Sequence, residues 1–410
     1  MSYPKTILVA GTFDTKDDEL SYLVSVIRRQ GGDVVTMDVS VLGDPSHPAH
    51  VSKHEVAEAG GSSIQAAIDS GDENQAMQIM AQGAAARALE LYREGRIDGV
   101  IVLGGTMGTD LALDLCAALP LGVPKYVVST VAFSPLLPPE RLAADIQMIL
   151  WAGGLYGLNS VCKASLSQAA GAVIGAAKAV ERTPRGRPLI GMTSFGKTVL
   201  RYMVALKPAL EERGFEVAVF HATGMGGRAF ESLAAEGAFA AVMDFAPQEV
   251  ANHIFGGLSA GADRMTAAGR AGTPQIVAPG CYDLVDFVGW QSVPPRLAGR
   301  PTHAHNRLLT SAVLDTDERR EVARALCGKL AGATAPVAFV LPEGGCNEWD
   351  RPGADLHDAA GLAAFVDEMK TSCPANVELY ALAAHINDEA FISKVLEIFD
   401  GWVEAGVLST

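Results

Sequence analysis

A run of aliphatic residues that ends in paired glycines constrains the fold most, because Val100–Leu103 is followed directly by Gly104 and Gly105. Such runs are typical of strands that are buried on both faces of a parallel sheet. Glycines allow a tight turn and let a ligand approach the backbone N–H groups. The following Thr109 and Asp110 predict a helix start, which adds unpaired N–H donors and the positive end of a helix dipole. The segment therefore predicts an α/β fold with an anion site, most simply for a phosphate.

A simpler interpretation of this segment is that Gly104 and Gly105 only permit a sharp strand-to-helix connection. The segment matches neither the P-loop nor the dinucleotide-binding fingerprint. The anion site therefore needs support from other parts of the chain.

The length and composition predict more than one α/β domain. A chain of 410 residues exceeds one ordinary core, and its 43 glycines and 49% hydrophobic residues suit close helix-to-sheet packing. The proline-punctuated stretch 183–188 is the predicted linker between an N-terminal domain, 1–182, and a C-terminal domain, 189–410. We expect two doubly wound, Rossmann-like α/β domains that face each other across a cleft.

The net charge of −15 argues against nucleic acid and anionic membranes as partners. An anionic ligand would have to be held by local hydrogen-bond donors. The six cysteines show no metal-binding spacing, no apolar run reaches the length of a membrane span, and the first residues do not form a signal peptide. We expect a soluble, cytoplasmic protein.

The first predicted strand, Thr6–Ala10, runs into the polar segment Gly11–Lys16. Small ligands commonly bind at this position in α/β domains, at the carboxyl ends of the strands. We expect the threonines and Lys16 to bind a phosphate, and Asp14 to bind a metal or a ribose. In the alternative, these are solvated residues at a helix start, where Asp14 or Thr15 caps the helix.

Two further strand ends are predicted to reach the same rim. The strand 33–40 carries Asp38, which is placed where Rossmann-like domains bind ribose, and the strand 123–130 ends in Ser129 and Thr130. The segment between these strands, from 41 to about 72, is predicted as a long loop. The residues predicted to bind the cofactor are Gly11, Thr12, Asp14, Thr15, Lys16, Asp38, Gly104, Gly105, Thr106, Met107, Gly108, Thr109, Ser129 and Thr130.

The second half of the chain repeats the alternation of short apolar runs and helical patterns. Its predicted strands are 189–194, 216–221, 240–244, 275–278, 337–341 and 377–383. Polar loops follow several of these strands, which predicts a substrate site at their carboxyl ends, in the cleft.

The densest of these loops is His221–Glu231, which combines three glycines with an arginine. It predicts a second anion site, in which Gly224, Gly226 and Gly227 line the loop and Arg228 binds an acid group of the substrate. The alternative is that Arg228 only forms a surface ion pair with an acid such as Glu231.

Histidines and an acid at other strand ends are candidates for proton transfer, and we assign that role to His221, His305, Glu343 and His385. His303 and His305 also form a His-x-His pair. Such a pair can chelate a metal, and a metal-dependent hydrolase would use His303, His305 and His385 as ligands. The alternative for the pair is a hydrogen-bonded loop at a domain interface.

Several motifs together resemble those of the tomato mosaic virus resistance protein family, over nearly the whole chain. They are Gly11–Lys16, Leu103–Thr109, Ser129–Ala132, His221–Ala229, His305–Asn306 and His385–Asp388. The resemblance implies a two-domain α/β fold, binding of ATP with Mg²⁺ in the N-terminal part, and a homodimer. The family usually carries Met-Arg-Thr-Thr after the His-Asn motif, where this chain has Leu308–Ser311, so the adjacent Arg307 would have to replace the missing arginine.

In the plant member of that family a TIM-barrel domain follows in the same chain, so here a TIM-barrel protein is expected as a separate partner. We expect an ATP-binding enzyme that acts on a small anionic metabolite held between the domains, with Asp14 as the Mg²⁺ ligand. One alternative is a regulatory module that binds a nucleotide without turnover, and the other is the hydrolase described above.

Overall fold

The computed structural model describes residues 4–154, 156–180 and 186–409, which form two compact units, 1–183 and 184–410. The predicted linker at 183–188 lies partly outside the described residues. Each unit is an α/β domain built on a parallel sheet, so the predicted fold class is confirmed. The expectation that the two domains face each other across a cleft stays a prediction.

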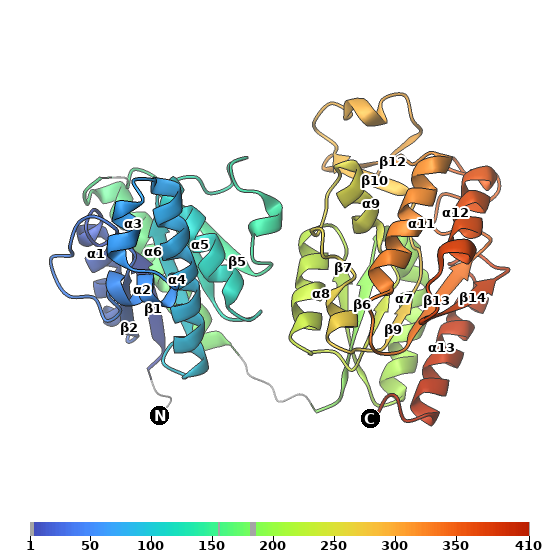
Figure 1. Ribbon diagram of the computed structural model, residues 1–410, viewed down its shortest axis with the longest axis horizontal. Helices are drawn as coiled ribbons and strands as arrows, with labels where there is room; N and C mark the ends of the chain where they lie inside the picture. Colours follow the sequence, from blue (N-terminus) through green and yellow to red (C-terminus); the bar gives the residue numbers. More distant parts are fainter. Residues whose placement is uncertain (1–3, 155, 181–185, 410) are drawn as a thin grey trace. The chain divides into compact units, whose positions relative to one another are not determined.

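The N-terminal unit contains a five-stranded parallel sheet in the order β2-β1-β3-β4-β5 (Figure 1). Its strands are β1 (Thr6–Gly11), β2 (Asp33–Asp38), β3 (Gly99–Gly104), β4 (Lys125–Ser129) and β5 (Ile146–Leu150). Because side chains alternate along a strand, Ile7 and Val9 of β1 face one side, whereas Leu8 and Ala10 face the other.

Helices cover both faces of this sheet. α1 (Asp17–Arg29) and α6 (Ser160–Ala179) pack on the side of Ile7 and Val9, whereas α2 (Lys53–Ala59), α4 (Glu73–Arg93) and α5 (Thr106–Ala118) pack on the side of Leu8 and Ala10. The order of the strands reverses between β1 and β3, and ligands bind at such switch points in open α/β sheets.

The prediction of one long loop from 41 to 72 is wrong, because this segment contains α2 and a short helix, α3 (Ile64–Asp69). Serine caps start both helices. The side chain of Ser52 accepts a hydrogen bond from the N–H of Glu55, whose side chain completes a capping box, and Ser63 caps α3.

The C-terminal unit contains a six-stranded parallel sheet in the order β14-β13-β9-β8-β6-β7. Its strands are β6 (Leu189–Ser194), β7 (Glu216–His221), β8 (Ala241–Asp244), β9 (Gln275–Val277), β13 (Val337–Pro342) and β14 (Val377–Leu382). α7 (Gly196–Glu212) and α13 (Glu389–Glu404) share a core with one face of the sheet. The other face is covered by α8 (Met225–Ala235), α9 (Gln248–Phe255), α10 (Ala267–Arg270), α11 (Thr316–Leu330) and α12 (Ala359–Ser372).

A small antiparallel sheet at one end of this unit was not predicted (Figure 1). It has the order β10-β12-β11 and consists of β10 (Leu284–Val288), β11 (Thr302–Ala304) and β12 (Leu309–Val313). Its register pairs Asp286 of β10 with Ser311 of β12, and Ser311 with His303 of β11. The sheet therefore brings polar residues together that lie far apart in the sequence.

Candidate functional site

The N-terminal unit has a cavity of about 610 Å³ at the carboxyl ends of β1 and β3. The loop after β1 lines one part of it with Thr12, Asp14, Thr15 and Lys16, and residues 104–108 line the adjacent part. The segment after β2 and the helices α3 and α4 complete the wall. The two loops that the sequence singled out thus lie at one cavity.

The turn from β3 into α5 explains why glycine is required at its first position. A Cβ atom on Gly104 would lie 2.6 Å from the Cα of Gly108, so no other residue fits this close approach of strand and helix. α5 begins at Thr106 after Gly105, and no side chain caps it. The first N–H groups of a helix have no partner within the helix, so they are available to an anion in the cavity.

The loop after β1 adds hydroxyl groups and a positive charge to this cavity. The hydroxyls of Thr12 and Thr15 lie 3.0 Å apart. The ammonium group of Lys16 donates a hydrogen bond to the carbonyl of Thr15, and no ion pair occupies it in the described part of the chain. The carboxylate of Asp14 accepts one hydrogen bond, from the N–H of Gly43, at 3.1 Å. The prediction that Asp14 or Thr15 caps α1 is wrong, because Lys16 is the N-cap residue and no side chain caps the helix.

The cavity is also lined by a set of apolar residues. The set includes Val39, Val41 and Met77, together with three side chains that are unusually exposed for their type. Leu42 is 79% exposed, Met107 45% and Ile68 37%. The cavity therefore combines hydrogen-bond donors with apolar contacts, which suits a ligand with a phosphate and a planar ring.

Four of the residues predicted to bind the cofactor lie beneath the loops and do not line the cavity. The carboxylate of Asp38 is buried and accepts hydrogen bonds from the backbone of Phe13 and from both the backbone and the hydroxyl of Ser40. The hydroxyls of Thr109 and Ser129 are buried and bond to each other at 2.7 Å, and Gly11 packs against Leu20. These internal contacts hold the loops in place. The polar groups are already satisfied within the protein, so they are not available to a ligand. Thr130 also does not line the cavity.

Two of the predicted catalytic residues lie near each other in the C-terminal unit. The ring of Phe195 is stacked on that of His221 at 6.2 Å and meets the edge of His305 at 5.6 Å. His303 lies beside His305, and Trp349 packs against both histidines. The alternative of a hydrogen-bonded loop at a domain interface stays a prediction, because these contacts all lie within the C-terminal unit.

A chain of hydrogen bonds fixes the ring of His305. The hydroxyl of Ser311 donates to the buried carboxylate of Asp286, and it lies 2.9 Å from Nε2 of His305. Because this hydroxyl uses its proton on Asp286, Nε2 of His305 must be the donor in the second bond. Burial and the nearby His303 lower the pKa of His305 to about 4, so the ring is neutral at pH 7 with the lone pair on Nδ1.

The buried carboxyl of Asp286 predicts a pH-dependent stability. Burial raises its pKa from 3.8 to about 6. Between pH 3.8 and about 6, the folded protein therefore keeps the proton of Asp286, whereas the unfolded chain releases it. The contribution of Asp286 to the free energy of unfolding is complete below pH 3.8 and is lost as the pH rises through about 6. We expect the free energy of unfolding of the wild type, relative to Asp286→Asn, to decrease from pH 4 to pH 7 in denaturant titrations. A constant difference across this range would contradict the assignment.

The other two predicted catalytic residues are engaged in internal contacts. His385 is 2% exposed, its Nε2 lies 2.8 Å from the carboxylate of Asp350, and its Nδ1 accepts from the N–H of Asn387. Glu343 forms an ion pair with Lys370. The described residues contain no group of three or more His, Cys, Asp or Glu side chains arranged to hold a metal, so the hydrolase alternative lacks its ligand set there.

The predicted anion site at Gly224–Gly227 is wrong, because the protein's own Glu249 fills it. This carboxylate is fully buried and accepts a hydrogen bond from the N–H of Gly224. A Cβ atom on Gly227 would collide with the same carboxylate, and one on Gly226 with the carbonyl of His221. The glycines therefore serve close packing around an internal anion.

The alternative that pairs Arg228 with Glu231 is also wrong. Arg228 donates to the carbonyl of Ala260 at 3.2 Å, whereas Glu231 is buried and pairs with Arg264. Arg264 is fully buried and donates to three carboxylates, those of Glu231, Asp244 and Glu249. Burial raises the pKa of Glu231 and raises that of Glu249 to about 7.

Comparison with known proteins supports the division into two α/β domains. The profile of the Uncharacterised protein family (UPF0261) N-terminal domain matches residues 5–182, and that of the C-terminal domain matches residues 187–403. A UPF0261 protein of Brucella melitensis is 55% identical over 98% of this chain and 96% of its own length. The ToMV resistance protein Tm-1 of Solanum lycopersicum is 32% identical over 75% of this chain and 42% of its own length.

Solved structures give only weak likenesses. A UDP-N-acetylglucosamine 2-epimerase aligns over 68% of this chain and 79% of its own, with 12% identity and a TM-score of 0.24. An ADP-heptose heptosyltransferase II of E. coli aligns over 67% and 84%, with 11% identity and a TM-score of 0.19. These similarities are too low to carry an argument about function.

The sheets and their covering helices define a protein of two Rossmann-like α/β domains, and the N-terminal one has a cavity at its topological switch point. The chain belongs to the UPF0261 family, and the predicted resemblance to the tomato mosaic virus resistance protein family is confirmed. Within the described ranges, no helix is long and apolar enough to cross a membrane.

Proposed function

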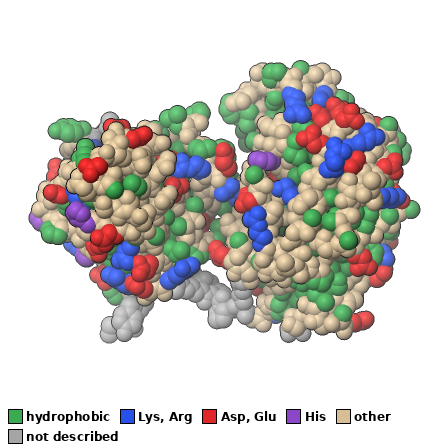
Figure 2. Space-filling model, viewed as in Figure 1, with side chains coloured by type: hydrophobic (Ala, Val, Ile, Leu, Met, Phe, Trp, Pro, Cys, Tyr) green, Lys and Arg blue, Asp and Glu red, His purple; other side chains and the backbone are tan. Residues whose placement is uncertain are grey.

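We propose that the N-terminal unit binds ATP with Mg²⁺, and that the protein is an enzyme acting on a small anionic metabolite. The observation that carries the nucleotide proposal is the uncapped start of α5 at a 610 Å³ cavity that Lys16 also lines. Backbone N–H groups, a helix dipole and an ammonium group that takes part in no ion pair among the described residues together suit a chain of phosphates. On the visible faces of both units, Arg and Lys side chains are interspersed with Asp and Glu side chains (Figure 2). Recognition of the phosphates would therefore come from the donors that line the cavity.

The remaining parts of a nucleotide fit the same cavity. The apolar wall formed by Leu42, Ile68 and Met77 suits an adenine ring. Asp14 offers a carboxylate in the same loop as Lys16, and Mg²⁺ is commonly held by one or two carboxylates together with phosphate oxygens. The ion would offset the negative charge that Asp14 places near the phosphates.

The setting and partners of this activity are part of the proposal. We place the protein in the cytoplasm, which is reducing, because all six cysteines are free thiols. A homodimer and a separate TIM-barrel partner follow from the family resemblance. A regulatory module would use the same nucleotide site without turnover, and slow ATP hydrolysis by the purified protein would favour the enzyme.

Calorimetric titration with ATP, ADP and adenosine tests the site, using Lys16→Met as the variant. We expect ATP to bind most tightly in the presence of Mg²⁺, because the N–H groups at the start of α5 and the ammonium group of Lys16 would bind its phosphates. Lys16→Met should weaken ATP binding by about tenfold, or ~1.4 kcal/mol, and leave adenosine binding nearly unchanged.

The matched control is Lys178→Met, which removes an exposed ammonium group of the same unit that donates to the carbonyl of Gln30. Its ATP affinity should equal that of the wild type. An equal loss in both variants, or equal affinities for ATP and adenosine, would contradict phosphate recognition by this cavity.

A further inference from the structure

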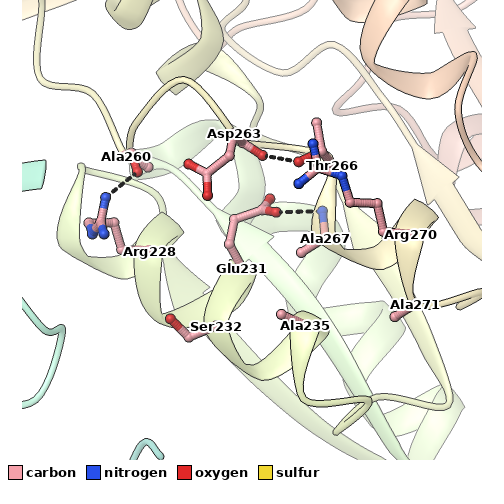
Figure 3. A pocket seen from close by; sticks show the side chains of 10 residues that line it. All are labelled: Arg228, Glu231, Ser232, Ala235, Ala260, Asp263, Thr266, Ala267, Arg270 and Ala271. Carbon is pink, nitrogen blue, oxygen red and sulfur yellow. Dashed lines mark hydrogen bonds between the residues drawn. The ribbon is translucent and has the colours of Figure 1, made fainter. Parts of the chain in front are cut away.

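A second cavity, of about 350 Å³, lies between α8 and α10 in the C-terminal unit (Figure 3). Arg228, Glu231, Ser232 and Ala235 line it from α8. Their spacing of three, four and seven residues places them on one face of the helix. The other side is lined by residues of the segment 260–271, which includes α10.

Two arginines of this cavity have no carboxylate partner among the described residues. Within the described ranges, Arg228 donates only to the carbonyl of Ala260, and the exposed Arg270 takes part in no ion pair. Arg264, in contrast, is saturated by three buried carboxylates. In a protein with a net charge of −15, two unpaired guanidinium groups at one cavity are available to an anionic ligand.

The acidic groups of the cavity decide what kind of anion can bind. Glu231 is engaged, because its two oxygens accept from the N–H groups of Met265 and Ala267 and it also pairs with Arg264. Asp263 is exposed, and no donor side chain bonds to its carboxylate in the described ranges. In Figure 3 the side chain of Asp263 lies between those of Arg228 and Arg270. A ligand that spans the cavity would therefore meet positive, negative and positive groups in turn.

Gly261 lies next to two of the charged groups that line the cavity. Its φ of +111° is a conformation that other residues rarely adopt. A Cβ atom at this position would lie 2.9 Å from the carboxylate of Asp263 and 3.1 Å from the guanidinium group of Arg228. A side chain here would occupy the space between the two charged groups.

We infer that the groove between α8 and α10 binds a small, elongated molecule that carries an anionic group at each end and a hydroxyl group between them. Arg228 and Arg270 bind the two anionic groups, and Asp263 accepts a hydrogen bond from the hydroxyl. Hydroxylated dicarboxylates and sugar bisphosphates share this chemistry. The inference deepens the proposed function, since it gives the small anionic metabolite a place and a chemical class.

Calorimetric titration of the full chain with four probes tests the inference. Tartrate and fructose 1,6-bisphosphate have two anionic ends and hydroxyl groups, glutarate lacks the hydroxyl groups, and glycerol 3-phosphate has only one anionic end. We expect at least one of the first two probes to bind more than about tenfold more tightly than the last two. Binding of tartrate would identify the ligand as a dicarboxylate, and binding of fructose 1,6-bisphosphate would identify it as a bisphosphate. Failure of both to bind at about 10 mM would overturn the inference.

Variants of the two arginines locate the binding. Arg228→Lys keeps the charge but loses the planar fork, and Arg270→Met removes the charge, so each should weaken the bound probe by about tenfold or more. The control is Arg320→Met, which removes an exposed arginine paired with Asp317. Equal affinities in all variants would remove the groove from consideration. ATP titrations of the same variants should match the wild type, so failure at this groove is distinguishable from failure of the nucleotide site.

Discussion

Replacing Arg264 by methionine is expected to destabilise the C-terminal unit by about 3–5 kcal/mol, which is the largest single effect that we predict. The guanidinium group is fully buried and donates to Glu231, Asp244 and Glu249, whose side chains are nearly inaccessible to water. Without it, three acidic groups remain in the interior with no opposite charge, and each must be protonated or hydrated at the expense of folding.

The pH dependence of this variant provides a second readout. Burial already raises the pKa of Glu249 to about 7 in the presence of Arg264, and removal of the positive charge should raise it further. A raised carboxyl pKa gives stability that is present at low pH and lost as the pH rises. The loss of free energy of unfolding in Arg264→Met, relative to the wild type, should therefore be smaller at pH 5 than at pH 8 in denaturant titrations.

The matched control for this prediction is Arg213→Met. Arg213 forms a partly exposed ion pair with Asp400, and such pairs contribute less than about 1 kcal/mol. A similar loss for both variants, or a deficit in Arg264→Met that does not depend on pH, would contradict the role assigned to the buried cluster.

Replacing Gly105 by valine is expected to weaken ATP binding by well over tenfold, or more than about 1.4 kcal/mol, while the protein stays folded. Gly105 precedes the first turn of α5 and lines the cavity, so an isopropyl group there would obstruct the approach of a phosphate to the helix N–H groups. Its φ of −76° and ψ of −152° lie in the extended region, so the substitution needs no left-handed backbone.

Gly175→Val is the control for this variant. Gly175 lies in α6 of the same unit, and an added Cβ atom would meet no atom within 4 Å. Calorimetry should show wild-type ATP affinity for this control. Unchanged affinity in Gly105→Val, with intact thermal unfolding, would move the nucleotide to another site.

The parallel sheets could be predicted because each strand is a local apolar run with a recognisable end. The aliphatic run Val100–Leu103 alone predicts a buried strand, and in the structure it lies in β3, at the centre of its sheet. The antiparallel sheet gave no such signal. Its strand β11 spans only residues 302–304, and it is separated from β10 by a segment with several prolines and glycines.

The candidate site was predictable only in part, because local patterns do not reveal which internal group fills a loop. The glycines at 224–227 have the composition of an anion site, yet the anion is Glu249, which follows more than twenty residues later in the sequence. Asp38 likewise stands at the expected distance for a ribose contact, but Ser40 and Phe13 use its carboxylate. In contrast, the loops at 12–16 and 104–108 line one cavity, where no side chain caps the start of α5 and, in the described part of the chain, no ion pair occupies Lys16.

A crystal structure of the full chain with Mg²⁺ and a non-hydrolysable ATP analogue tests the central claim most directly. We predict the phosphates at the N–H groups that begin α5, within reach of Lys16, with the metal at Asp14 and the adenine against Leu42 and Ile68. Density for the analogue elsewhere, or a cavity that stays without the analogue at saturating concentration, would contradict the nucleotide site proposed for the N-terminal unit.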